Sequence, residues 1–286
     1  MIFLGIDGGG SKTAFLLEND EGRELARFET GPSNWISSGA ETARESLAEG
    51  AARLPVLPDI VAGGFAGAGR PEGIEFYRGC LTALLPQARL FVESDVFITY
   101  MGAIGPMPGV LVVAGTGSIA LARQSDGTMV RAGGWGPVFS DEGSGFWIGR
   151  EAIRHALRAN DAAESSEFIA EVTRTLKLRS ILEAPWAWKT GVLDVRSVAS
   201  LASVVSGHYP AEPAKQILDE AARHLRELFH LARKRAGLPE SCTRSVSGSV
   251  GSQPLMQHLL HLNFSPPSNP PARGAILWAR DRIQSS

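Results

Sequence analysis

Cysteine is scarce in this chain, which has only Cys80 and Cys242 among its 286 residues. No cluster of cysteine and histidine has the spacing of a structural zinc site, which argues against a zinc-bearing protein. Cys80 falls in a segment whose apolar residues Tyr77 and Leu81 keep helical spacing. We therefore expect Cys80 to be a small core residue of a helix.

Long apolar runs and an excess of charge are also missing. A membrane-spanning helix needs about eighteen or more consecutive apolar residues, and the chain has no such run. The net charge of -2 gives no electrostatic footprint for nucleic acid. The first residues look like a strand and lack the basic region and cleavage site of a secretory signal. We expect a cytoplasmic protein with neither nucleic acid nor a membrane as partner.

Glycine, in contrast, is concentrated in a turn near the N-terminus. Met1–Leu17 contains two apolar runs around Gly8-Gly9-Gly10, and the second run is too short for a helix. The P-loop pattern fails because Ser11 stands where its lysine should be. The stretch predicts strand, turn, strand, with an anion held by backbone N–H groups. Asp7 would repel a phosphate there unless a cation lay between them, which implies Mg²⁺, although a tight hairpin with a satisfied aspartate fits equally well.

A second stretch, Val110–Ala122, repeats this plan around Gly115-Thr116-Gly117-Ser118. It also matches the dinucleotide signature Gly-x-Gly-x-x-Ala, which requires a helix after the glycines. The turn Asp126-Gly127 follows too soon for a helix, so we expect a strand and exclude a Rossmann site. Two hairpins of one design suggest two related lobes.

Three further segments carry polar residues of interest. Asn34-Trp35 lies in a turn-rich loop and suits a sugar, since amides bind hydroxyl pairs and rings cover apolar sugar faces. A loop amide and a core tryptophan explain it equally well. Asp95 is expected between a strand and the helix Val96–Ala103, where it would be the N-cap and would be kept ionised by the helix dipole. Asp141-Glu142 precede an expected helix that begins near Gly143-Ser144.

Helix boundaries follow from capping and composition. Ser38–Glu41 has capping-box spacing and predicts a helix to about Leu54. Pro213–Ala236 is amphipathic and predicts a long core-facing helix. Trp186 and Trp188 are interpreted as packing or interface residues.

Taken together, these features resemble the superfamily of sugar kinases, actin and heat-shock chaperone ATPases. The duplicated hairpin with Asp7 in its first copy carries that resemblance. Asn34-Trp35, Gly133–Gly136 and Asp141–Gly145 are similar to the N-acetylglucosamine kinase branch, which belongs with the BadF/BadG-type ATPases. The resemblance implies an α/β fold of two actin-like, ribonuclease H-like lobes with a nucleotide- and sugar-binding cleft between them.

The resemblance also implies lobe boundaries. The first lobe would comprise residues 1–104 with a C-terminal helix at 272–286, and the second residues 105–271. Gly274-Ala275 would open that helix, and its small residues would let it cross a second connecting helix closely.

Roles for individual residues follow from the same resemblance. It implies ATP and Mg²⁺ as cofactors, an amino sugar phosphorylated at O6, Asp95 as catalytic base, and Asp7 as a magnesium ligand through water. The nucleotide would contact Asp7, Gly8, Gly9, Gly10, Ser11, Lys12, Thr13, Gly115, Thr116, Gly117, Ser118 and, in the small-residue loop Ser245–Ser252, Gly248 and Ser249. The sugar would contact Asn34, Trp35, Asp95, Thr116, Gly134, Trp135, Asp141 and Gly145, with Gly145 giving room for an N-acyl group.

Alternatives remain open at this stage. N-acetylglucosamine, glucosamine and N-acetylmuramic acid are not separated by any single residue. An ATPase that activates an electron-transfer enzyme has the same fold, and its relatives bridge an iron–sulfur cluster with two cysteines per subunit. A non-catalytic sugar sensor is weaker because Asp7 and Asp95 are both present. The family resemblance also implies a homodimer.

Overall fold

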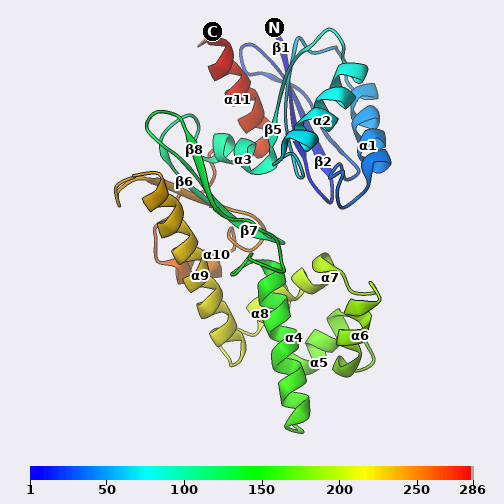
Figure 1. The fold of residues 1–286 in the computed structure, drawn as a ribbon, viewed down its shortest axis with the longest axis vertical. Coiled ribbons are helices and arrows are strands. Elements are labelled where there is room, and N and C mark those ends of the chain that lie inside the picture. The colour runs from blue at the N-terminus through cyan, green and yellow to red at the C-terminus, as the bar shows by residue number, and fades with distance from the viewer. Residues whose placement is uncertain (285–286) are drawn as a thin grey trace. The chain divides into compact units, whose positions relative to one another are not determined.

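A computed structural model describes residues 1–284, which form two compact units (Figure 1). Among the described residues, unit 1 comprises 1–107 and 267–284, and unit 2 comprises Pro108–Pro266. Each unit has its own mixed sheet, and hydrophobic clusters lie on both faces of the sheet in unit 1 and in a single core in the described part of unit 2. No helix within residues 1–284 combines the length and the apolar character needed to cross a bilayer.

Unit 1 is built on a five-stranded sheet of order β3-β2-β1-β4-β5. Its strands are β1 (Ile2–Gly8), β2 (Thr13–Asn19), β3 (Glu24–Thr30), β4 (Ile60–Phe65) and β5 (Arg89–Ser94). The first three form an antiparallel meander, whereas β4 and β5 run parallel to β1. The carboxyl ends of β1, β4 and β5 therefore meet at one edge of the sheet.

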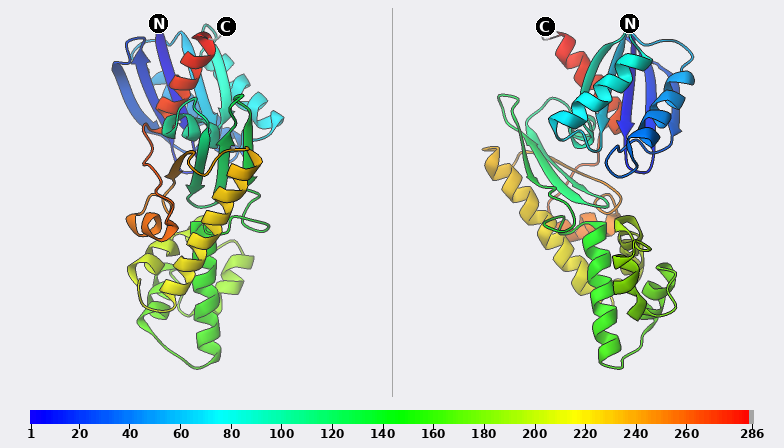
Figure 2. Two further views of the ribbon diagram at one scale, coloured as in Figure 1. Left: turned by 90° about the vertical axis from the view of Figure 1, so that its left-hand side faces the viewer. Right: turned by 45° about the vertical axis from the view of Figure 1, so that its right-hand side comes forward.

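Two pairs of helices cover the sheet of unit 1, which Figure 2 shows from two sides. The helices are α1 (Ala40–Ala52), α2 (Pro71–Leu84), α3 (Asp95–Ala103) and α11 (Pro271–Gln284). Helices α1 and α2 pack in the core that contains Leu4 and Ile6, and α3 and α11 pack in the core that contains Phe3. Because neighbouring residues of a strand point to opposite faces, the two pairs lie on opposite faces of the sheet.

Three helix starts differ from those expected. The N-cap of α1 is Gly39, with φ 88° and no side-chain hydrogen bond, so the capping box at Ser38 is wrong. The N-cap of α3 is Ser94 rather than Asp95, because β5 pairs with β4 up to Ser94 and the helix begins at the next residue. Helix α11 begins at Pro271, before the expected Gly274, as a proline in the first turn of a helix allows.

Unit 2 has a four-stranded sheet of order β8-β7-β6-β9. Its strands are β6 (Gly109–Ala114), β7 (Ser118–Arg123), β8 (Met129–Gly133) and β9 (Thr243–Ser247). Its helices are α4 (Gly145–Asp161), α5 (Glu167–Thr175), the 3₁₀ turn η1 (Ile181–Glu183), α6 (Ala184–Lys189), α7 (Val195–Ala199), α8 (Leu201–Gly207), α9 (Ala214–Arg235) and α10 (Pro254–Leu260). The expected apolar stripe of α9 is confirmed, with Leu225 and Phe229 almost fully buried.

The two units repeat one local plan. In unit 1, β1 pairs antiparallel with β2 across a glycine turn and parallel with β4. In unit 2, β6 pairs antiparallel with β7 across a glycine turn and parallel with β9. The strand, turn, strand prediction is confirmed for both stretches, and a strand rather than a Rossmann helix follows Gly117.

Candidate functional site

The first glycine turn joins β1 to β2 and is closed by a hydrogen bond of 2.9 Å from the Gly9 N–H to the Lys12 carbonyl oxygen. A side chain at Gly8 would overlap the ring of Phe65, so the turn admits only glycine there. Lys12 is exposed and forms a 2.5 Å ion pair with Glu29. Ser11 is exposed as well, whereas the hydroxyl oxygen of Thr13 is buried, 2.8 Å from the Gly31 carbonyl oxygen. Among these polar residues, Ser11 and Lys12 have the side chains that reach solvent.

This turn also holds the loop that contains Asn34. The Gly9 carbonyl oxygen accepts hydrogen bonds from the N–H groups of Ser33 and Asn34, at 3.0 and 3.2 Å. The Asn34 side-chain oxygen accepts in turn from the N–H groups of Ile36 and Ser37, at 3.0 and 3.3 Å. The amide oxygen of Asn34 thus shapes its own loop, and its amide nitrogen is the group suited to an external acceptor.

Trp35 is partly buried beside this loop. Its ring stacks on Phe76 with centroids 5.3 Å apart, and its indole N–H donates to the Gly67 carbonyl oxygen at 3.2 Å. Gly67 has φ 92°, and a side chain there would meet the indole of Trp35 at 2.9 Å. The loop after β4 and the Asn34-Trp35 loop therefore pack on each other.

Asp7 and Asp95 lie at the edge where the parallel strands of unit 1 end. Asp7 pairs in register with Gly64, while Asp95 follows the last residue of β5. Burial, followed by the negative charge of Asp95, raises the pKa of Asp7 to about 7, although Lys12 opposes this. Both carboxyl groups thus share one poorly solvated region of unit 1.

The pKa of Asp95 is raised, whereas a carboxylate at a helix start was expected to have a lowered pKa. Burial raises its pKa, even though the Val96 N–H donates to its carboxylate at 2.9 Å. Loss of hydration outweighs the backbone N–H donors of Val96 and Asp95, because the side chain is buried at the edge of a packed sheet.

A cation suits this pair. Burial raises the pKa of both carboxyl groups, and the charge of Asp95 raises that of Asp7 further, so a divalent ion would stabilise their ionised forms. Mg²⁺ prefers oxygen ligands and retains several waters. Within residues 1–284 no cluster of three or more His, Cys, Asp or Glu side chains forms a metal cage. One carboxylate and water molecules, with Asp7 as the protein ligand, therefore fit better than an all-protein site.

The second glycine turn joins β6 to β7 in unit 2. Its Gly115 N–H donates to the Gly117 carbonyl oxygen at 2.9 Å, and the Ala114 carbonyl oxygen accepts from the N–H groups of Val250 and Gly251, each at 2.9 Å. Gly248 has φ 92°, and a side chain there would collide with the backbone of Ala114 and Gly115. The structure thus brings the loop after β9, including Gly248 and Ser249, onto this turn.

The segment before α4 is fixed to the same turn. The Gly115 carbonyl oxygen accepts from the Gly145 N–H at 2.8 Å, and the Thr116 carbonyl oxygen accepts from the Phe146 N–H at 3.2 Å. The Ser118 hydroxyl donates to the Glu142 carbonyl oxygen at 2.8 Å. Helix α4 is capped by Ser144, whose hydroxyl accepts from the Trp147 N–H.

Asp141 is the polar centre of this segment. It is 7% exposed, has φ 67°, and its carboxylate accepts backbone hydrogen bonds from Gly136 and Ser118. A side chain at Gly117 would lie 2.7 Å from its carboxylate, so the aspartate packs on the glycine turn. Burial raises its pKa, and the two backbone donors offset part of that rise.

The other residues expected to bind sugar in unit 2 differ in exposure. Trp135 is 67% exposed, with the Arg131 guanidinium 3.9 Å from its ring centroid. Gly134 has φ 71° and packs on Ile119. A side chain at Gly145 would lie 3.1 Å from the Gly115 carbonyl oxygen, so packing inside unit 2 already favours a glycine here. Its role toward an N-acyl group stays a prediction.

The expected site residues therefore form two groups, one in each unit. The group in unit 1 gathers around the first glycine turn, and the group in unit 2 around the second. Sequence reasoning missed Tyr77 and Ser33, whose polar atoms join the loops of unit 1. The available signal was a tyrosine within the apolar stripe of α2, since a buried tyrosine hydroxyl needs a partner.

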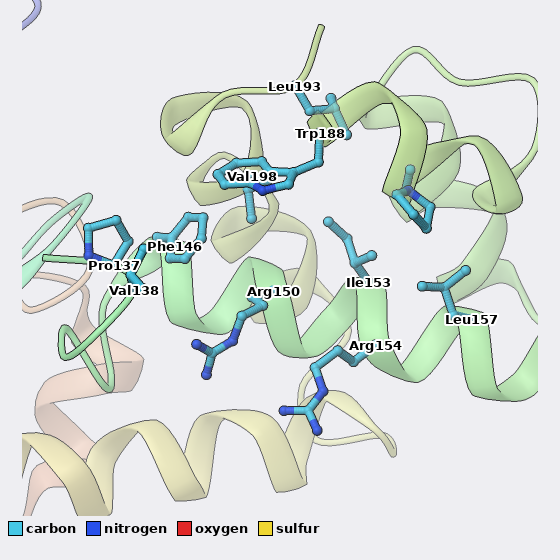
Figure 3. A pocket seen from close by; sticks show the side chains of 12 residues that line it. Pro137, Val138, Phe146, Arg150, Ile153, Arg154, Leu157, Trp188, Leu193 and Val198 are labelled. Carbon is cyan, nitrogen blue, oxygen red and sulfur yellow. The ribbon is translucent and has the colours of Figure 1, made fainter. Parts of the chain in front are cut away.

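A pocket of about 390 Å³ lies farther along α4, between this helix and the segment that carries Trp188 (Figure 3). Phe146 and Trp188 line it with ring centroids 5.7 Å apart, whereas Trp186 is 67% exposed. Among the described residues, its lining contains none of those expected to bind nucleotide or sugar.

Neither cysteine is fully buried. Cys80 packs against the core of unit 1 on α2, as expected, but it is only partly buried. Cys242 is also partly exposed, and it belongs to the other unit. Burial raises the pKa of both thiols, which disfavours the thiolate form that binds metal clusters.

Comparisons with known proteins agree with this architecture. Residues 4–279 match the profile of the BadF/BadG/BcrA/BcrD ATPase family. The N-acetylmuramic acid/N-acetylglucosamine kinase of Clostridium acetobutylicum is 34% identical over 233 residues, which are 78% of this chain and 76% of that protein.

Solved structures extend the comparison. A Chromobacterium violaceum structure, provisionally assigned as an N-acetylglucosamine kinase, has a TM-score of 0.77 and 27% identity, covering 96% of this chain and 98% of its own. A ROK family glucokinase from Streptomyces griseus, in complex with glucose and AMPPNP, shares the fold with a TM-score of 0.58. It has 15% identity and covers 100% of both chains. The expected α/β fold of two actin-like lobes is confirmed.

Proposed function

Because the chain belongs to the BadF/BadG/BcrA/BcrD ATPase family, we propose that it is an ATP-dependent kinase that phosphorylates an amino sugar. The observation that carries the proposal is the desolvated pair Asp7 and Asp95 beside the first glycine turn. A metal-chelated phosphate and a hydroxyl nucleophile need two such carboxylates with separate tasks. The relative from Clostridium acetobutylicum supports an amino sugar as acceptor.

In this proposal the two glycine turns bind the triphosphate of ATP. Gly8–Thr13 and Gly115–Ser118 would donate backbone N–H groups to phosphate oxygens, as backbone nests do. Lys12 would leave its exposed ion pair with Glu29 and add a positive charge. Gly248 and Ser249, held on the second turn, would lie under the adenosine. Mg²⁺, bound through water to Asp7, supplies charge neutralisation at the phosphates when present.

The amino sugar would be bound by one pair of residues from each unit. The Asn34 amide nitrogen and the Trp35 ring suit a hydroxyl and an apolar sugar face. Asp141 suits a pair of sugar hydroxyls, because its carboxylate is already oriented by two backbone donors. Trp135 offers a largely exposed ring.

Asp95 would act as the catalytic base. Its carboxylate takes the proton from the attacking hydroxyl, O6 of the sugar, while the new O–P bond forms and the bond from the γ-phosphorus to the leaving ADP oxygen breaks. The raised pKa of Asp95 makes its ionised form a better proton acceptor. Because the transition state is loose and the proton leaves late, orientation of the hydroxyl matters as much as basicity.

The finer proposal is N-acetylglucosamine as the preferred acceptor, with glucosamine and N-acetylmuramic acid as competitors. The Clostridium acetobutylicum relative is an N-acetylmuramic acid/N-acetylglucosamine kinase, which covers two of these three sugars. We further propose that the protein is a cytoplasmic homodimer.

A coupled ADP-release assay over hexoses and amino sugars tests the proposal. We expect ADP release that depends on N-acetylglucosamine, stops when Mg²⁺ is chelated, and is much slower with glucose. Sugar-independent ATP hydrolysis by a purified protein with iron–sulfur absorbance would instead favour an ATPase activator of an electron-transfer enzyme. Sugar binding without turnover would indicate a sensor.

A further inference from the structure

Tyr77 lies in unit 1 and is not among the residues proposed to bind nucleotide or sugar. It is fully buried on α2, and its ring stacks on Phe65 of β4 with centroids 4.1 Å apart. Its hydroxyl oxygen lies 2.6 Å from the Ser33 carbonyl oxygen and 2.9 Å from the Ala66 carbonyl oxygen, and accepts from the Trp35 N–H at 3.2 Å. One side chain therefore bonds to two separate loops.

The chemistry of a phenol matches these three partners. The hydroxyl has one proton to share between the carbonyl oxygens of Ser33 and Ala66, and its lone pairs are free to accept from Trp35. Burial raises the pKa of Tyr77 to about 12, which keeps the proton on the oxygen at neutral pH. The Tyr77 hydroxyl therefore contacts two carbonyl acceptors and one N–H donor at once.

The same loops are bonded to the first glycine turn. The Ala66 N–H donates to the Gly8 carbonyl oxygen at 2.8 Å, and the Ser33 N–H donates to the Gly9 carbonyl oxygen at 3.0 Å. The Thr13 hydroxyl lies 2.8 Å from the Ser33 hydroxyl. Tyr77 therefore closes a hydrogen-bonded ring that contains the glycine turn, the Ser33–Trp35 loop and the loop after β4.

We propose that Tyr77 is a positioning residue for sugar binding. Tyr77 holds the Asn34-Trp35 loop at a fixed distance from the glycine turn. This inference rests on the proposed kinase function. Tyr77 makes no contact with substrate in it, since its hydroxyl is consumed by backbone groups. Tyr77 keeps Asn34 and Trp35 in their binding conformation in the free protein, so that sugar binding does not bear the entropic cost of ordering this loop.

The substitution Tyr77→Phe tests this role, because it keeps the ring and its stacking on Phe65 and removes only the hydroxyl. A loop that has lost its anchor must be ordered by the sugar itself. We expect the KM for the sugar to rise about tenfold or more, while kcat at saturating sugar and the KM for ATP change by less than about threefold. A defect that was only structural would lower the amount of active protein, and hence the apparent kcat, without moving KM.

Tyr100→Phe is the matched control. Tyr100 is also fully buried in unit 1, and its hydroxyl donates to the Met107 carbonyl oxygen at 2.7 Å, away from the ring described above. Tyr100→Phe likewise removes one buried phenol hydroxyl and keeps the ring. We expect its sugar KM to stay at the wild-type value.

Amide hydrogen exchange gives a second measurement that is independent of turnover. Tyr77→Phe should speed exchange in residues 33–37 and 66–68, with little change in β1 and β2. If Tyr77→Phe does not fold, Ser33→Ala removes the hydroxyl contact with Thr13, which separately attaches the Ser33–Trp35 loop to the glycine turn, and should raise the sugar KM in the same direction.

The outcomes separate the two proposals. If the wild-type protein releases ADP with an amino sugar and Tyr77→Phe keeps the wild-type KM, the positioning role is wrong and the kinase function stands. An equal rise in KM for Tyr100→Phe would also overturn it, since any lost buried hydroxyl would then suffice. If the wild-type protein turns over no sugar of the panel, the proposed function fails and the inference fails with it.

Discussion

Gly274 of α11 packs directly on the backbone of Gly102 of α3, where a side chain on Gly274 would collide with the Gly102 nitrogen. The Gly102 carbonyl oxygen also accepts from the Asn269 N–H at 2.8 Å. These contacts fix α3 against α11, and α3 begins with Asp95. The close crossing expected from small residues at this point is therefore present, and it sets the position of the proposed base.

Gly274→Ala should destabilise unit 1 by about 1–3 kcal/mol or more, because the added methyl overlaps the Ile98 carbonyl oxygen and the Gly102 nitrogen. Chemical denaturation measures the loss. Gly79→Ala is the matched control, since a side chain at this helical glycine meets nothing within 4 Å. It should be neutral or stabilising by about 0.5–1 kcal/mol. Equal effects of the two substitutions would argue against a close helix crossing.

Asp95→Asn should lower kcat by about 10²- to 10⁴-fold while the sugar Kd changes much less, because an amide cannot take the hydroxyl proton. Steady-state ADP release gives kcat, and calorimetry gives the sugar Kd. Glu93→Gln is a suitable control, as Glu93 is a neighbouring carboxyl group whose pKa is also raised by burial. Near-wild-type turnover in Asp95→Asn would remove Asp95 from the mechanism.

Asp7→Asn should stabilise the ligand-free protein at alkaline pH. The folded-state pKa of about 7 exceeds the ordinary value of 3.8, so the stabilisation from protonated Asp7 is complete below about pH 4 and is lost as pH rises through about 7. At pH 8 the variant should exceed the wild type by at most about 4 kcal/mol, with the difference vanishing near pH 4. Urea unfolding at several pH values without Mg²⁺ or nucleotide measures this, and parallel stability profiles would contradict it.

Asp141→Asn should raise the sugar KM by about tenfold or more, because a charged acceptor for sugar hydroxyls is replaced by a neutral one. Asparagine tolerates the left-handed backbone of φ 67° at this position, so the loop should keep its shape. Asp126→Asn changes the same group in the exposed turn after β7 and should leave the sugar KM unchanged. A KM equal to that of the wild type in Asp141→Asn would exclude this carboxylate from sugar binding.

The two hairpins were predictable because their signals are local. An apolar run, a glycine turn and a second short run define a strand pair without reference to the rest of the chain. The pKa of Asp95 was not predictable, since it depends on how much of the sheet edge and of α3 surrounds the carboxyl group. The choice of Ser94 rather than Asp95 as N-cap likewise depends on where β5 stops pairing with β4.

The hydrogen bonds of Tyr77 were likewise not predictable from the sequence. Its spacing with Leu81 predicts a helix face correctly, yet its hydroxyl partners lie 42 and 44 residues earlier in the chain. A periodic pattern identifies the buried face of a helix and carries no information on which loop that face will meet. Roles that depend on tertiary hydrogen bonds therefore cannot be predicted from a single sequence.

In each unit, carbonyl oxygens of the glycine turn hold the segment proposed for sugar: Gly9 accepts from Ser33 and Asn34, and Gly115 and Thr116 accept from Gly145 and Phe146. In such an enzyme, the preference for the nucleotide that donates the phosphoryl group and the preference for the sugar that accepts it should not change independently. Laboratory selection for a new sugar should repeatedly bring altered nucleotide affinity with it, and variants that change one without the other should be rare.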